Sequence, residues 1–124
     1  MKEFSLKKEE RLCSRKLIGS LFLEGESFFI FPLKVVYLKS DLPGGGPVQA
    51  AFTVSRKNFK RAVKRNLLKR RMREAYRLNK QILSQSDDRV PLAVMFIYAA
   101  REEKDYRIIE RSMKQALLKL SAVK

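Results

Sequence analysis

The chain has 124 residues, 45% of them hydrophobic, and 28 Lys and Arg against 13 Asp and Glu give it a formal net charge of +15 at pH 7. That length suits one compact domain over residues 1–124, and the hydrophobic fraction excludes a disordered basic tail. Such a charge excess is typical of chains that bind a polyanion, which can be nucleic acid, an anionic membrane or an acidic protein. Nucleic acid is favoured because neutralising its dense phosphates releases counterions.

Other classes of protein are disfavoured by what the sequence lacks. Cys13 is the only cysteine, so no disulfide can form within the chain, which fits a cytoplasmic location. Residues 1–8 lack the apolar region of a secretory signal, and the longest apolar stretch, residues 91–100, is too short for a membrane helix. Histidine is absent and the adjacent acidic pairs lie far apart in the sequence, so we expect neither a catalytic residue nor a metal site in the protein.

The first predicted helix covers Ser14–Glu24 and follows a polar segment, residues 1–13, that we expect to be extended or partly mobile. Gly25 can close this helix in a left-handed conformation. Its apolar residues repeat at helical spacing: Leu17, Ile18, Leu21 and Phe22.

The next segment, residues 27–39, is rich in Phe and Val and predicts β-structure. Pro32 interrupts it because proline cannot donate to a sheet ladder, so we expect either one bulged edge strand or two short strands, the second being Leu33–Lys39. A Gly-rich loop, Asp41–Pro47, leads to a strand over Val48–Ser55, which we expect to run antiparallel to the first across that loop.

A long helix is predicted from Lys60 or Arg61 to about Ser84, followed by a turn at Asp87–Arg89. Val90–Ala99 is a nearly continuous apolar run, which indicates a strand buried on both faces. A last amphipathic helix covers Asp105–Leu120. The order helix, strands, helix, strand, helix predicts an α+β fold, a two-layer α/β sandwich with a central and mostly antiparallel sheet.

The positive charge is concentrated in the segment from Arg56 to Arg73, where ten of eighteen residues are basic and no acid occurs. On a helical wheel one arc is apolar and the opposite arc is cationic, except that Arg71 falls within the apolar arc and would have to extend past its neighbours to reach water. Like charges repeat at i,i+4 in this stripe, a pattern that destabilises an isolated helix unless a polyanion neutralises it. We therefore predict RNA contacts at Arg56, Lys57, Arg61, Lys64, Arg65, Asn66, Lys69, Arg70, Arg73 and Arg77.

Three alternatives to this interpretation fit the sequence to different degrees. A ribosomal or other structural RNA-binding protein could have the same composition. A DNA-binding protein is less favoured, because no second helix with a short Gly-containing turn precedes the basic helix. A membrane-surface helix would need a free apolar face, which the core is expected to occupy.

The segment AVKRNLLKRRMRE, from Ala62 to Glu74, resembles the signature of the bacterial ribonuclease P protein subunit. That signature is an Arg-Asn-Arg-type run followed by Lys-Arg and a further Arg-Glu on the same helix. Arg65, Asn66, Lys69, Arg70 and Arg73 match it, whereas Leu67 stands where the family usually has Arg, and Lys64 or Arg61 could substitute. The resemblance extends to Glu10-Arg11-Leu12, Leu21-Phe22 and Gly25, to Phe52-Thr53-Val54-Ser55 with Arg56-Lys57, and to the strand Val90–Tyr98.

The resemblance implies a small α/β sandwich with a left-handed crossover at the basic helix, an exception to the usual right-handed rule. It implies that the protein binds the catalytic RNA of ribonuclease P and assists removal of the 5′ leader from precursor tRNA. Mg²⁺ would be held mainly by the RNA and not by a protein site. The single-stranded leader would lie in a cleft between the first helix and the sheet, lined by Ile18, Phe22, and Val36 or Tyr37.

Overall fold

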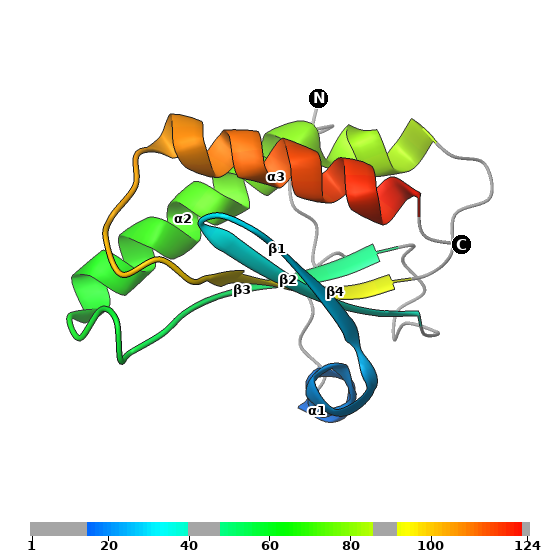
Figure 1. The fold of residues 1–124 in the computed structure, drawn as a ribbon, viewed down its shortest axis with the longest axis horizontal. Helices are drawn as coiled ribbons and strands as arrows, with labels where there is room; N and C mark the ends of the chain where they lie inside the picture. The colour runs from blue at the N-terminus through cyan, green and yellow to red at the C-terminus, as the bar shows by residue number, and fades with distance from the viewer. Residues whose placement is uncertain (1–14, 40–47, 86–91, 123–124) are drawn as a thin grey trace.

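A computed structural model describes residues 15–39, 48–85 and 92–122 of the chain. Its elements are α1 (Arg15–Glu24), β1 (Glu26–Ile30), β2 (Leu33–Lys39), β3 (Val48–Val54), α2 (Ala62–Asn79), the 3-10 helix η2 (Lys80–Gln85), β4 (Leu92–Tyr98) and α3 (Tyr106–Ser121). Figure 1 shows α2 and α3 side by side on one face of the sheet and α1 on the other. The predicted α+β class and element order are confirmed, while the predictions for residues 1–13, 41–47 and 87–89 lie outside the described residues.

The four strands form one mixed sheet in the order β1-β2-β4-β3. β1 pairs antiparallel with β2, β2 antiparallel with β4, and β3 parallel with β4. β3 runs antiparallel in direction to β2, as the sequence predicted, but the two strands do not pair because β4 lies between them. The nearly continuous apolar sequence of β4 explains this, because an interior strand buries both of its faces.

Two strands flank Pro32, which settles the choice between one bulged strand and two short ones. The Phe31–Pro32 peptide is cis and lies at the turn between β1 and β2. In β2 alternate side chains face opposite sides of the sheet. Leu33, Val35 and Tyr37 lie on the side of α2 and α3, whereas Val36 and Leu38 lie on the side of α1.

The main core lies between the sheet and the pair α2 and α3. Its centre is an aromatic cluster in which Phe96 of β4 stacks on Phe52 of β3 with ring centroids 5.5 Å apart. Tyr76 of α2 lies 5.6 Å from Phe96 and 5.7 Å from Phe52. These contacts fix α2 against the sheet, and Tyr76 is a buried residue that the helical wheel did not place in the apolar arc.

A smaller core lies between α1 and the opposite face of the sheet, where Leu21 packs on Val36, Ala93 and Met95. Gly25 ends α1, but it does not adopt the left-handed conformation expected from the sequence. Its backbone is instead too close to its neighbours for a side chain: a Cβ there would lie 2.4 Å from the carbonyl oxygen of Leu21. A Cβ would also lie 3.0 Å from the carbonyl oxygen of Tyr37 in β2, so the tight end of α1 and its close approach to β2 together explain this glycine.

The basic segment forms α2 over Ala62–Asn79 and continues as the 3-10 turn η2, within two residues of the predicted start. Its link from β3 to the parallel strand β4 is a crossover, whose left-handedness stays a prediction. α3 begins where Asp105 accepts a hydrogen bond from the backbone N–H of Ile108 at 3.2 Å, a typical N-cap. In the described ranges, no helix has both the length and the apolar character to cross a membrane.

Candidate nucleic-acid interface

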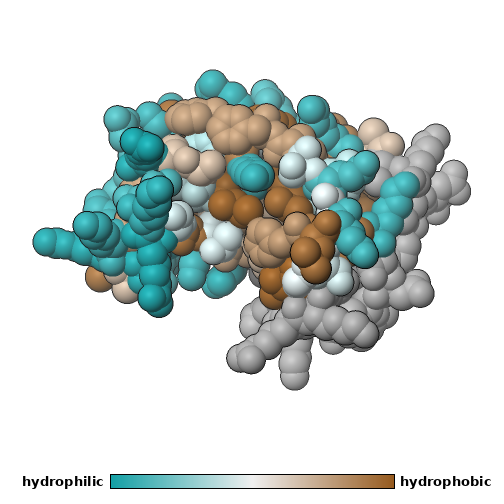
Figure 2. All heavy atoms as spheres, turned by 60° about the horizontal axis from the view of Figure 1, so that its bottom comes forward, coloured by the Kyte–Doolittle hydropathy of each residue, from teal (hydrophilic) through white to brown (hydrophobic). Residues whose placement is uncertain are grey.

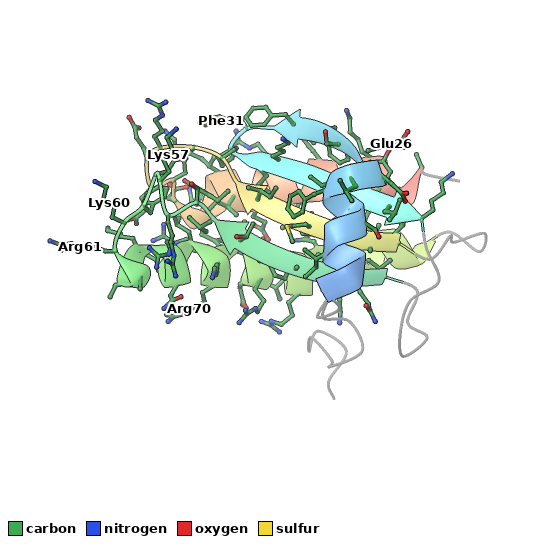
Figure 3. The ribbon with its side chains drawn as sticks, turned by 90° about the horizontal axis from the view of Figure 1, so that it is seen from below. Glu26, Phe31, Lys57, Lys60, Arg61 and Arg70 are labelled. Carbon is green, nitrogen blue, oxygen red and sulfur yellow. The ribbon has the colours of Figure 1, made fainter. Side chains whose placement is uncertain are left out.

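The outer side of α2 carries a cationic stripe, which we define as Lys69, Arg70 and Arg73. Arg70 and Arg73 are exposed and Lys69 is half-buried. Among the described residues, none offers these three side chains a hydrogen bond or an ion pair, so their charge is not neutralised within that part of the protein. Figure 3 shows Arg70 pointing away from the sheet. The predicted neutral residue of this surface, Asn66, is exposed beside the stripe.

The charge continues into the loop that precedes α2. Arg56, Lys57, Lys60 and Arg61 are exposed, and Figure 3 shows the last three gathered at the N-terminal end of the helix. Positive charge at a helix N-terminus is unfavourable because the helix dipole is positive there. The first turn of α2 contains no acid that could offset this, and Arg61 at the N-cap makes no capping hydrogen bond. An external anion bound at this end of α2 would offset the repulsion between these cations and the helix dipole.

Arg65 has a structural role that the sequence did not reveal. Its Nη1 donates hydrogen bonds to the carbonyl oxygens of Phe59 at 2.9 Å and Lys60 at 2.8 Å. Phe59 is in turn held by an edge contact with the ring of Tyr98, with centroids 5.7 Å apart. Arg65 therefore positions the basic loop, and its guanidinium is partly committed to the protein.

We predict that Arg65→Lys will weaken RNA binding roughly tenfold although the charge is kept. Lysine lacks the planar fork that reaches both carbonyl groups, and one hydrogen bond to a charged group is worth about 1.5–3 kcal/mol. The slope of log K against log salt should stay unchanged, because no phosphate contact is removed. Filter binding across a salt series measures both, and Arg111→Lys, at an exposed position of α3 without such contacts among the described residues, is the matched control. Wild-type affinity of Arg65→Lys would contradict this role.

Lys64 and Arg71 connect α2 to the loop between β4 and α3. Lys64 forms an ion pair with Glu103, and Arg71 lies 3.0 Å from the same carboxylate and donates to the carbonyl oxygen of Lys104 at 2.8 Å. The hydrogen bond from Lys64 holds the pKa of Glu103 below its usual value, with Arg71 adding to the effect. The helical wheel suggested that Arg71 extends to water. It does not, because the loop between β4 and α3 supplies it with partners. Of the two proposed substitutes for the Arg missing at Leu67, Arg61 stays exposed while Lys64 is paired.

The far end of the predicted stripe is neutralised within α2. Arg77 donates to both carboxylate oxygens of Glu74, at 3.0 and 2.7 Å. This hydrogen bonding holds the pKa of Glu74 below its usual value. The run of like charges therefore ends at Arg73, one turn earlier than the sequence pattern indicated.

The four residues predicted to line a cleft beside α1 do not all lie together. Phe22 is 59% exposed on α1, Ile18 packs beside it on the smaller core, and Val36 is on the facing strand but only 6% exposed. Tyr37 is on the other face of the sheet, where its ring lies 5.9 Å from Phe28. Of the two alternatives for the strand position, Val36 faces α1 and Tyr37 does not, because adjacent strand residues point to opposite faces.

A row of residues that sequence reasoning missed crosses the sheet beside α1. Phe29 of β1 pairs with Lys34 of β2, Lys34 with Ile97 of β4, and Ile97 with Thr53 of β3, so all four side chains share the α1 face. Phe29 and Lys34 are exposed, and Ile97 and Thr53 are half-buried. Alternation with the buried Val36 could have identified Lys34. Figure 2 shows hydrophobic surface in the middle of this face, with hydrophilic side chains projecting at one end.

A small α+β protein with a cationic stripe that has no partner among the described residues is typical of the nucleic-acid-binding class. The family Ribonuclease P matches residues 6–121 of the chain. A ribonuclease P protein component from Porphyromonas gingivalis is 38% identical over 120 residues, covering 95% of this chain and 88% of that protein. Its counterpart from Chlorobium phaeobacteroides is 36% identical over 125 residues, covering 91% and 86%.

Solved structures agree with these relatives. The ribonuclease P protein of Thermotoga maritima superposes with a TM-score of 0.71 at 25% identity, covering 89% of this chain and 96% of that one. The Staphylococcus aureus protein shares the fold with a TM-score of 0.70 at 20% identity, covering 94% and 98%. The chain therefore belongs to the ribonuclease P protein component family, and so to a tRNA-processing ribonucleoprotein with an RNA partner. These relatives are ribonuclease P proteins and not ribosomal proteins.

Proposed function

We propose that this protein binds the catalytic RNA of ribonuclease P and the 5′ leader of precursor tRNA, and thereby assists endonucleolytic removal of that leader. The observation that carries the proposal is the stripe of Lys69, Arg70 and Arg73, which has no partner among the described residues and continues into the exposed basic loop before α2. In this proposal the RNA supplies the catalytic groups and holds Mg²⁺. The protein supplies fixed positive charge and a surface for single-stranded RNA.

The stripe and the loop would act on the catalytic RNA by charge. Two RNA molecules repel each other through their phosphates, and Mg²⁺ or salt must otherwise screen that repulsion. Arginine suits this role because its planar guanidinium can clamp a phosphate with two hydrogen bonds. Since Arg65 already fixes the loop carbonyl groups, Lys60 and Arg61 reach the RNA from a defined position and not from a mobile chain.

The sheet face beside α1 would hold the leader. Phe22 presents an exposed ring on which a base can stack, and such stacking is worth roughly 1–3 kcal/mol per base. Ile18 and Val36 add apolar contact at its base, while Lys34 supplies a cation within the open row. This surface favours no particular base, because every base offers a π face.

Reconstitution with the cognate catalytic RNA tests the proposal. We expect the protein to stimulate leader removal most strongly at low Mg²⁺, where the RNA alone is least able to bind its substrate. Cleavage of a labelled precursor tRNA is followed over a magnesium series, with and without protein. A matched basic protein of another fold controls for non-specific charge. Equal rates with and without the protein at every magnesium concentration would refute the assignment.

A further inference from the structure

An exposed aromatic pair, Phe29 and Phe31, lies at the turn between β1 and β2, where Phe29 ends the row of side chains beside α1 and Phe31 follows it. Phe31 in the turn is 53% exposed and Phe29 at the end of β1 is 57% exposed. Their ring centroids are 6.3 Å apart and the rings meet edge to face. Single exposed hydrophobic residues are common, but two adjoining phenylalanines that together expose more than half of their surface indicate a binding role.

The turn that carries Phe31 is held in place from two sides. The hydroxyl of Ser112 in α3 donates a hydrogen bond to the carbonyl oxygen of Phe31. The backbone N–H of Ala99 donates to the carbonyl oxygen of Pro32 at 2.8 Å. Pro32 and Ser112 are both buried, so the turn that carries Phe31 is anchored to the core. A ring on an anchored backbone loses little conformational entropy when a ligand stacks on it.

Two cations, Lys104 and Arg101, lie beside the ring of Phe31. Lys104 Nζ lies 5.6 Å from the centroid of Phe31, and a shallow depression of about 230 Å³ lies between Phe31, Ala100, Arg101, Glu102 and Lys104. Arg101 is exposed, and within the described residues it has no hydrogen-bond or ion-pair partner. Among the described lining residues Glu102 is the one acid; its side chain is 81% exposed and pairs with Lys104 at 3.3 Å, so solvent screens its charge.

The loop beside Phe31 is rigid and continuous with the cationic surface of α2. The buried hydroxyl of Tyr98 donates to the carbonyl oxygen of Glu102 at 2.6 Å and accepts from the N–H of Lys104 at 2.8 Å. Arg71 of α2 donates to the carbonyl oxygen of the same Lys104. Figure 3 shows Phe31 toward the end of the molecule that carries Lys57. A nucleic-acid strand that follows the basic loop could therefore continue to Phe31.

We propose that Phe31, with Phe29 beside it, is a stacking site for one unpaired nucleobase of RNA, and that Arg101 and Lys104 hold the neighbouring phosphate. The inference rests on the proposed function only in taking RNA as the partner. The depression is below the usual 300–1,000 Å³ of a small-molecule pocket, whereas one base can lie on an open ring. The base can come from the leader or from an unpaired segment of the catalytic RNA, which share this chemistry.

Binding of a short single-stranded RNA that carries one 2-aminopurine tests the site directly, because stacking quenches its fluorescence. We expect Phe31→Ala and Phe31→Leu to bind about 5- to 100-fold more weakly with less quenching, and Phe31→Trp to retain both. Phe31→Leu keeps an apolar side chain over the turn, so it remains informative if Phe31→Ala unfolds. Leu118→Ala, which trims another exposed apolar side chain, should bind as wild type. Wild-type binding and quenching by Phe31→Leu would overturn the proposal.

The holoenzyme then distinguishes the two sources of the base. Affinity of Phe31→Leu is measured for the catalytic RNA alone, and affinity of the reconstituted holoenzyme for precursor tRNA with and without its leader. A loss confined to the leader-bearing precursor assigns the site to the leader, and a loss with the catalytic RNA alone assigns it to that RNA. If neither affinity falls, the site is overturned even when the wild-type protein stimulates cleavage. The short-RNA measurement needs no cleavage, so it stands apart from the reconstitution test.

Discussion

Replacing Lys69, Arg70 and Arg73 together by Gln should weaken binding to the catalytic RNA about 100- to 500-fold at 0.1 M salt. Each phosphate contact contributes roughly 0.7–0.9 to the slope of log K against log salt, so three contacts contribute about 2 to 3. The three side chains have no partner among the described residues, so their loss should leave the free energy of unfolding nearly unchanged. Titration of labelled RNA over a salt series measures affinity and slope together.

A second triple variant with the same change in net charge separates the stripe from charge in general. It replaces three exposed cations of α3 by Gln: Arg107, Arg111 and Lys114. We expect that variant to lose far less affinity, because it leaves the surface of α2 and its loop intact. Equal losses in both variants would show that net charge, and not the stripe, determines binding. Arg70→Ala alone should lower the slope by about one.

The strands and helices were predictable because their hydrophobic periods are local. The apolar run of β4 predicted burial on both faces, and Leu92 to Phe96 and Tyr98 are buried. Strand pairing was not predictable in the same way, since it depends on which strand competes best for an interior position. A loop joining β2 to β3 suggested neighbours, but β4, about forty residues further along the chain, takes the place between them.

The candidate site was predictable as a surface but not residue by residue. Same-sign charge at helical spacing placed Lys69, Arg70 and Arg73 on one side of α2, where the structure also places them. The wheel could not reveal that Arg71 has partners in a loop over thirty residues away, or that Arg65 bonds the loop before its own helix. Such contacts depend on tertiary structure, which a single helix does not encode.

The exposure of the aromatic residues was also not predictable from the sequence. A run of phenylalanines predicted a strand but could not say which rings would be buried. Phe28 faces the main core, whereas Phe29 is exposed on the α1 face and Phe31 is exposed in the turn at Pro32. The register of β2 likewise decides between Val36 and Tyr37, and one residue of difference moves a side chain through the sheet.

Phe96→Ala should have the largest effect on stability, lowering the free energy of unfolding by about 3–5 kcal/mol. Phe96 is fully buried and contacts both Phe52 and Tyr76, so its removal leaves a cavity between β3, β4 and α2. A loss of that size is a large fraction of the roughly 5–15 kcal/mol that stabilises a typical domain. Urea denaturation followed by circular dichroism measures it.

The matched control is Phe22→Ala, which removes the same side chain from the exposed surface of α1. Its free energy of unfolding should change by no more than about 0.5 kcal/mol, the usual range for surface positions. The two variants should therefore separate stability from RNA binding. Phe22→Ala should fold normally but hold leader-bearing precursor less tightly, whereas Phe96→Ala should lose affinity only to the extent that α2, through Tyr76, loses its position on the sheet. A Phe96→Ala protein as stable as wild type would mean that the aromatic cluster does not hold α2 in place.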